Sequence, residues 1–133
     1  MSAKKILIID DDEHLVVGLT AKLKANGYAV VSAMDAVAAV AVTRQETPDL
    51  ILLDLGLPAG DGFLVLERLK ALSQMVSTPV IVLSARDPAS NKQRALQAGA
   101  IAFFQKPPDN RELLTEIGRA LGEKAALPQF LKT

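Results

Sequence analysis

Five short apolar runs alternate along the chain with longer stretches in which apolar residues recur every three or four positions. The runs are rich in Ile, Leu and Val and show little polar alternation. That pattern is typical of strands buried on both faces of a parallel sheet. The predicted strands are Lys5–Ile9, Tyr28–Ala33, Leu50–Leu53, Pro79–Leu83 and Ile101–Phe104.

The intervening stretches carry helix start and stop signals as well as helical periodicity. Acidic residues placed to cap or open helices are Asp12, Asp35, Asp61 and Asp109, the last with Glu112 at capping-box spacing. The fourth helix is expected to begin near Pro88, and the ends fall at Asn26-Gly27, Glu46 before Pro48, and Ala98-Gly99. Residues expected to face the core are Leu15, Val16, Leu19, Leu23, Phe63, Leu66, Leu69, Leu113, Leu114, Ile117 and Leu121.

This order predicts an α/β fold of the (βα)₅ type. We expect a doubly wound, five-stranded parallel sheet with helices on both faces and right-handed crossovers. The 133 residues suit one domain. We place that domain at residues 1–122, followed by a tail or linker at residues 123–133 that contains Pro128.

The composition argues against several classes of function. The 15 basic and 15 acidic residues balance, and Trp is absent, so neither nucleic acid nor an anionic membrane is an expected partner. No apolar run reaches the roughly 20 residues that span a bilayer, and we see no signal peptide. The absence of Cys excludes disulfides and thiolate metal sites, and it agrees with a cytoplasmic location.

The chemistry is predicted to lie beyond the carboxyl ends of the strands, where open parallel sheets bind ligands. Asp10-Asp11-Asp12-Glu13, Asp54, Ser84 and Lys106 each follow or end such a strand. Crowded carboxylates without His or Cys favour a hard cation, Mg²⁺ above all. Together with a lysine and a hydroxyl they suit phosphoryl transfer, with Asp as a feasible nucleophile. Neither Gly-rich phosphate-binding motif is present, so ATP or NAD is not the expected ligand.

These residues and spacings resemble the receiver domains of two-component response regulators. The resemblance covers Lys4 to Leu121 and implies a flavodoxin-like receiver fold. It is carried by the segments Lys5-Ile-Leu-Ile-Ile-Asp-Asp-Asp12, Pro48-Asp-Leu-Ile-Leu-Leu-Asp54, Leu57-Pro58, Asp61-Gly62, Pro79-Val-Ile-Val-Leu-Ser-Ala85, Ala98-Gly-Ala100 and Lys106-Pro107.

The resemblance implies a phosphoacceptor and a metal site. Asp54 matches the aspartate that is phosphorylated. Asp11 matches the direct Mg²⁺ ligand of the acidic pair, and Asp10 matches its neighbour, which acts through bound water. Gly56 matches the residue whose backbone carbonyl also binds the metal.

The resemblance also implies a response to phosphorylation. Ser84 and Lys106 match the hydroxyl and the ammonium that bind the phosphoryl group, and Phe103 matches the aromatic residue that switches. The Lys106-Pro107 bond matches one that is cis in the family.

The implied function is a phosphorelay switch, not an enzyme with an external substrate. Receivers catalyse their own phosphorylation, from a histidine kinase or a histidine phosphotransfer protein, and their own dephosphorylation. The fourth helix, fifth strand and fifth helix then form the expected docking face for an effector or a second copy. The chain is either a stand-alone receiver or a segment of a longer protein.

Some positions depart from the family pattern. Phe103 lacks a hydroxyl, so switching at this position would rely on ring packing alone. Ile101-Ala102 stand where acidic residues are frequent, and this edge is therefore more apolar than usual. Gly56 offers no side chain to guide or block water, whereas Arg86 can reach the pocket mouth.

Other interpretations stay open. The acidic residues could be solvated loop groups or caps, Ser84 an N-cap, Lys106 a surface lysine and Phe103 plain core. His14 is expected to be an exposed helix residue, not a phosphohistidine. At the level of function, the rivals are a receiver-like interaction module that works without phosphorylation and a Mg²⁺-dependent phosphatase.

Overall fold

Five parallel strands form one sheet in the order β2-β1-β3-β4-β5. The computed structural model describes residues 3–57 and 62–123. The strands are β1 Lys5–Ile9, β2 Ala29–Ala33, β3 Leu50–Leu53, β4 Val80–Ser84 and β5 Ala102–Gln105. The predicted fold class is confirmed, and the predicted strand boundaries are wrong by at most one residue.

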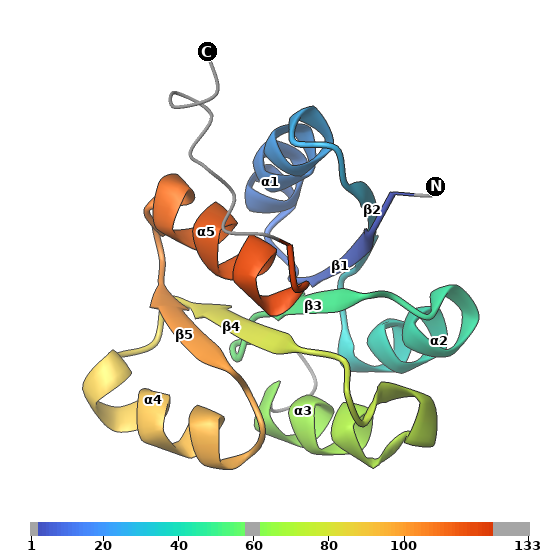
Figure 1. Ribbon diagram of the computed structural model, residues 1–133. Helices are drawn as coiled ribbons and strands as arrows, with labels where there is room; N and C mark the ends of the chain where they lie inside the picture. The colour runs from blue at the N-terminus through green and yellow to red at the C-terminus, as the bar shows by residue number, and fades with distance from the viewer. Residues whose placement is uncertain (1–2, 58–61, 124–133) are drawn as a thin grey trace.

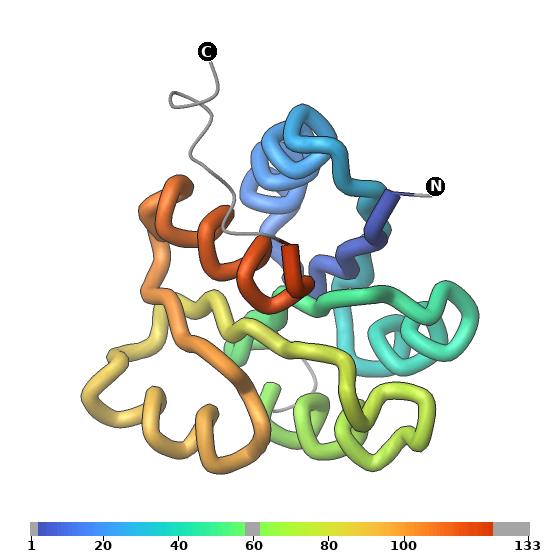
Figure 2. Tube along the Cα trace, viewed as in Figure 1, coloured from blue at the N-terminus to red at the C-terminus, as the bar shows by residue number. Residues whose placement is uncertain are grey.

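Helices cover both faces of the sheet. Figure 1 shows α1 and α5 on one face and α2, α3 and α4 on the other, and the tube in Figure 2 follows the same alternation along the chain. The helices are α1 Glu13–Ala25, α2 Ala36–Glu46, α3 Gly62–Ala71, α4 Pro88–Gln97 and α5 Asn110–Ala120, with a short 3₁₀ helix, η1, at Ser73–Met75. The sequence did not predict η1. No helix among the described residues is long and apolar enough to cross a bilayer.

Side-chain caps fix the starts of the helices. The carboxylates of Asp12, Asp35 and Asp109 each accept a backbone N–H of the first turn, as predicted. Helix α4 is capped by Asp87, whose Oδ1 accepts the N–H of Ala89. The alternative that Ser84 is the N-cap is therefore wrong, because Ser84 still belongs to β4. The predicted cap Asp61 and residues 124–133 of the predicted tail lie outside the described residues.

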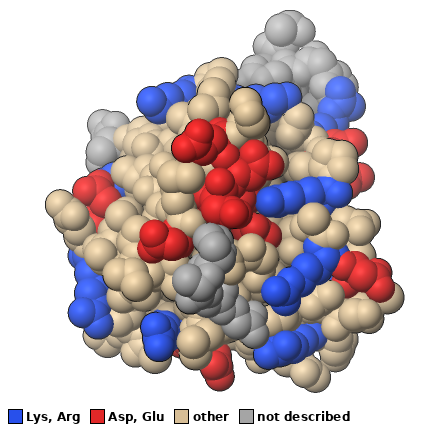
Figure 3. Space-filling model, turned by 180° about the vertical axis from the view of Figure 1, so that it is seen from behind, with Lys and Arg blue, Asp and Glu red and all other residues tan. Residues whose placement is uncertain are grey.

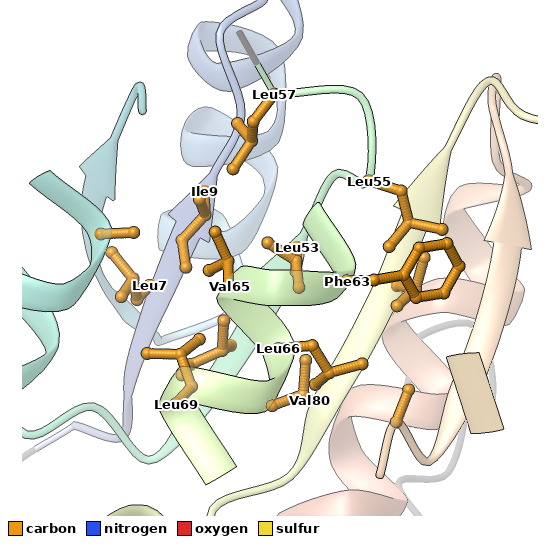
Figure 4. Packing of buried hydrophobic residues seen from close by; sticks show 14 of the residues in the cluster. Leu7, Ile9, Leu53, Leu55, Leu57, Phe63, Val65, Leu66, Leu69 and Val80 are labelled. Atoms are coloured by element: carbon orange, nitrogen blue, oxygen red, sulfur yellow. The ribbon is translucent and has the colours of Figure 1, made fainter. Parts of the chain in front are cut away.

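Two apolar clusters hold the layers together, one on each side of the sheet. Figure 4 shows part of the cluster between the sheet and α3, where Leu53, Phe63 and Leu66 are labelled. The other cluster lies under α1 and α5. Most predicted core residues are buried, but four are only partly buried: Leu15, Val16, Leu114 and Leu121.

Strand register brings the acidic residues together. Ile9 of β1 pairs with Leu53 of β3, so the residues that follow them, Asp10 and Asp54, leave the sheet side by side. The N–H of Asp54 donates to the carbonyl of Ile9 at 2.9 Å, which extends the ladder by one residue. The site is thereby built on the most deeply buried part of the sheet.

Candidate functional site

Acidic side chains gather in one patch on the molecule. Figure 3 shows Asp and Glu clustered near the centre of one face, with Lys and Arg side chains along one side of the cluster. Within the described residues, Asp10, Asp11 and Asp54 each offer a carboxylate oxygen, and these oxygens lie within 4.8 Å of one another. The three aspartates predicted from the sequence thus form one site.

Backbone and side-chain donors orient the two buried carboxylates. Asp10 is 2% exposed and Asp54 is 7% exposed, whereas Asp11 is exposed to solvent. Asp10 Oδ1 accepts the N–H of Asp12 at 2.9 Å. Asp54 Oδ1 accepts the N–H of Gly56 at 3.1 Å. These bonds leave the second oxygen of each carboxylate facing the pocket and Lys106.

Lys106 reaches the site from the loop that follows β5. Its backbone N–H donates to the carbonyl of Ser84 at 2.9 Å, and its bond to Pro107 is cis, as the resemblance implied. Its Nζ lies 2.7 Å from Asp10 Oδ2 and 3.6 Å from Asp54 Oδ2. The interpretation of Lys106 as a plain surface lysine is therefore wrong.

Burial and charge act against each other in this pair. Burial raises the pKa of the Asp10 carboxyl, and the nearby Asp54 charge adds to that, although the hydrogen bonds from Lys106 and Asp12 pull the other way. Burial alone would lower the pKa of Lys106, but its hydrogen bond to Asp10 and the charges of Asp10, Asp54 and Asp12 raise it. The lysine therefore stays protonated at neutral pH.

The charge balance and donor types define what the pocket can hold. Three ionised carboxylates against the ammonium of Lys106 leave an excess of two negative charges. A divalent cation offsets that excess, and a purely oxygen donor set favours Mg²⁺ over softer metals. The residues present therefore fit a magnesium ion.

The other predicted residues occupy the expected elements. Ser84 is fully buried at the end of β4, and its Oγ accepts the N–H of Arg86 at 3.1 Å. Gly56 is exposed beside Asp54, Phe103 is partly buried against the core, and Ile101 is 44% exposed just before β5. His14 is an exposed residue of α1, as predicted.

Gly62 positions the site in a way that the sequence analysis did not identify. A Cβ at this position would lie 2.4 Å from Leu55 Cα and 2.8 Å from the carbonyl oxygen of Asp54. Only a residue without a side chain lets α3 begin so close to the chain that carries Asp54. The Asp-Gly pair in the sequence was the available signal, but by itself it indicates only a turn.

The family model for the response regulator receiver domain matches residues 6–118. The chain belongs to this family. It is accordingly a regulatory phosphoacceptor module of two-component signalling and not a classical enzyme. Receiver domains as a class act together with histidine kinases.

Characterised relatives share the domain over most of this chain. The chain is 36% identical to the DNA-binding dual master transcriptional regulator RpaA of Synechocystis over 96% of its length, which is 53% of RpaA. The chain spans about half the length of several of the curated relatives it matches.

Solved structures agree with the fold. A CheY-like receiver domain from Methanospirillum hungatei superposes with a TM-score of 0.85 at 32% identity, covering 91% of this chain and 95% of that one. The receiver domain of the sensor histidine kinase PA1611 of Pseudomonas aeruginosa superposes with a TM-score of 0.83 at 28% identity, covering 92% of this chain and 100% of that one. That receiver holds a magnesium ion in its active-site cleft.

Proposed function

We propose that this chain is a phosphorylation-controlled signalling switch in which Asp54 accepts a phosphoryl group from a phosphohistidine. The donor is a histidine kinase or a histidine phosphotransfer protein. The observation that carries the proposal is the meeting of Asp10, Asp11 and Asp54 within 4.8 Å, with Lys106 against two of them. We place the receiver at residues 1–122 and a tail or linker at residues 123–133, in a cytoplasmic protein.

The transfer needs positioning more than covalent assistance. A carboxylate oxygen of Asp54 attacks phosphorus, a P–O bond forms, and the P–N bond to the donor imidazole breaks. The Gly56 N–H holds Asp54 Oδ1 at 3.1 Å, so the nucleophile is oriented before the donor arrives. The imidazole leaves with the electron pair of the broken bond and takes up a proton.

Asp11, Asp54 and the Gly56 carbonyl would hold Mg²⁺ directly, and Asp10 would do so through water. Bound there, the ion supplies positive charge that offsets the charge of the phosphoryl oxygens. The all-oxygen donor set and the two excess negative charges support this assignment. The magnesium-bound receiver of PA1611 has the same fold and supports it by analogy.

Ser84 and Lys106 would then bind the new acyl phosphate and pass the change to the surface. Lys106 is within 3.6 Å of Asp54 already. Ser84 would exchange its bond from the Arg86 N–H for one to the phosphoryl group, which leaves space for Phe103 to move inward. We propose that the surface formed by α4, β5 and α5 thereby changes its affinity for a protein effector or for a second copy of the chain.

The direct test is Mg²⁺-dependent labelling by acetyl phosphate or by a cognate kinase. Asp54→Ala should abolish labelling. Asp35→Asn is the matched control, because Asn caps α2 equally well and Asp35 lies outside the cluster of three. Wild-type labelling of the Asp54 variant would contradict the assignment. A wild type that neither binds Mg²⁺ at millimolar concentration nor becomes labelled would instead favour a phosphorylation-independent interaction module.

A further inference from the structure

The side chain of Arg94 in α4 covers the ring of Phe63 in α3. Its guanidinium carbon lies 3.8 Å from the ring centroid. A cation over an aromatic face is attracted by the ring quadrupole. Figure 1 shows α3 and α4 as neighbours on the same face of the sheet, so this contact joins two successive helices that β4 separates in the chain.

The Phe63 side of the contact is fixed to the segment that carries Asp54. Phe63 is 3% exposed and belongs to the same core cluster as Leu55, and both are labelled in Figure 4. The neighbouring Gly62 donates its N–H to the Leu55 carbonyl at 3.1 Å and has no room for a Cβ. The backbone that leads into Phe63 is therefore held against the backbone of Leu55, the residue after Asp54.

The Arg94 side of the contact is far less firmly held. Among the described residues, α4 buries Ala95 alone, whereas α3 buries five residues: Gly62, Phe63, Val65, Leu66 and Leu69. A helix that buries little apolar surface has low local stability. A cavity of about 340 Å³ also borders the contact, lined by Phe63, Leu64, Glu67, Arg94 and Ala98. The interface between α3 and α4 thus leaves room for α4 to shift.

Helix α4 is also connected to the site through the residues that precede it. Ser84 Oγ accepts the N–H of Arg86, and α4 begins two residues later at Pro88. If Ser84 turns toward a phosphoryl group, as the proposed function requires, the start of α4 loses this anchor. The contact between Arg94 and Phe63 would then be what resists the movement of α4.

We propose that Arg94 is a positioning residue that holds α4 against the Asp54 segment and so sets the threshold of the switch. This inference rests on the proposed function. Loss of the contact should lower the free-energy difference between the described arrangement and the phosphorylated one. By linkage, any ligand that favours the phosphorylated arrangement should then bind more tightly.

The test measures the affinity for beryllofluoride in the presence of Mg²⁺ by fluorine NMR or by backbone amide shifts of β5. Arg94→Gln should bind beryllofluoride about two- to fivefold more tightly than the wild type, as expected from the loss of one exposed cation–π contact. Arg94→Lys keeps a cation without the planar stack, and its affinity should lie between those of the wild type and Arg94→Gln. Lys92→Gln removes the same charge from another exposed position of α4 and should match the wild type.

A double-mutant cycle with Phe63→Leu separates the stacking from any other contact of Arg94. The effects of Phe63→Leu and Arg94→Gln should be less than additive. A purely structural role would lower stability without tightening beryllofluoride binding. Equal or weaker binding by Arg94→Gln would overturn the inference and leave the proposed function standing. Failure of the wild type itself to bind would overturn the proposed function.

Discussion

Lys106 is paired more closely with Asp10 than with the proposed phosphoacceptor. Its Nζ lies 2.7 Å from Asp10 Oδ2, whereas the distance to Asp54 Oδ2 is 3.6 Å. The ammonium thus neutralises part of the negative charge that would also attract a magnesium ion. On phosphorylation, the more strongly charged phosphoryl oxygens would draw the lysine away from Asp10.

Replacing Lys106 by Met should therefore strengthen Mg²⁺ binding while uncoupling the switch. Removing the positive charge that contacts Asp10 and Asp54 should favour a divalent ion on these carboxylates by about 1 kcal/mol even in a water-like dielectric, roughly a five- to tenfold gain in affinity. Magnesium titrations monitored by NMR check this, with Lys22→Met in the last turn of α1 as the control for net charge. Weaker Mg²⁺ binding by the Lys106 variant would show that the lysine organises the carboxylates instead of competing with the ion.

The sequence predicted the fold and the acidic site because both depend on local patterns. Apolar runs marked the strands to within one residue, and the fixed geometry of parallel strands then placed Asp10 next to Asp54. Asp12, Asp35 and Asp109 were recognisable as caps because the capping bond spans three residues. Such contacts can be found by spacing alone.

Other features depend on how distant segments approach each other, and sequence spacing does not contain that information. The contact between Arg94 and Phe63 joins two helices, and the sequence pattern predicts only that each residue belongs to a helix. The preference of Lys106 for Asp10 depends on a difference in distance that no pattern encodes. The close approach at Gly62 is likewise invisible until Leu55 and α3 are placed.

Gly62→Ala should destabilise the protein and weaken the site. The new Cβ would meet Leu55 Cα at 2.4 Å and backbone oxygens at 2.7 and 2.8 Å, and backbone atoms cannot give way as a flexible side chain can. We expect a loss of about 1–3 kcal/mol in the free energy of unfolding, as for other overpacked sites. Urea denaturation measures it, and weaker Mg²⁺ binding should accompany it.

Gly18→Ala is the matched control for that variant. Gly18 lies within α1, and no atom beyond its chain neighbours and the adjoining helix backbone lies within 4 Å of the position that a Cβ would take there. The same substitution should therefore stabilise the protein by roughly 0.5–1 kcal/mol, since Ala is the better helix former. Similar effects of the two substitutions would show that the crowding at Gly62 is relieved by movement of α3.

Gly56→Leu should lengthen the lifetime of the phosphoryl group on Asp54. A Cβ at Gly56 would lie 3.6 and 3.7 Å from the two Asp54 carboxylate oxygens, an ordinary contact distance. A Cβ is thus accommodated there, and a larger side chain is expected to cover the acyl phosphate. We expect hydrolysis to slow by about three- to tenfold because water is excluded from the reacting carbon–oxygen–phosphorus group.

The loss of label over time after removal of excess acetyl phosphate measures this lifetime. Gly56→Ala should change it much less, because a methyl group reaches the carboxylate but does not cover it. Faster hydrolysis in the Leu variant would mean that the side chain turns outward and leaves water access unchanged or improved.

Tyr28 should report the packing of the chain beyond α5 through its ionisation. Burial, followed by a hydrogen bond to Glu123 and the charge of that carboxylate, raises the pKa of Tyr28 from 10.0 to about 12. Because the folded-state pKa is raised, the stabilisation is fully present below about pH 10 and is lost as the pH rises towards 12.

Tyr28 is the one tyrosine of the chain and Trp is absent, so its ultraviolet titration is free of overlap. Glu123→Gln should move the midpoint down towards 10.0 without reaching it, because burial persists. Glu112→Gln, in the first turn of α5, should leave the midpoint near 12. A wild-type midpoint at the ordinary value would show that Tyr28 is neither buried nor bonded to Glu123 in solution.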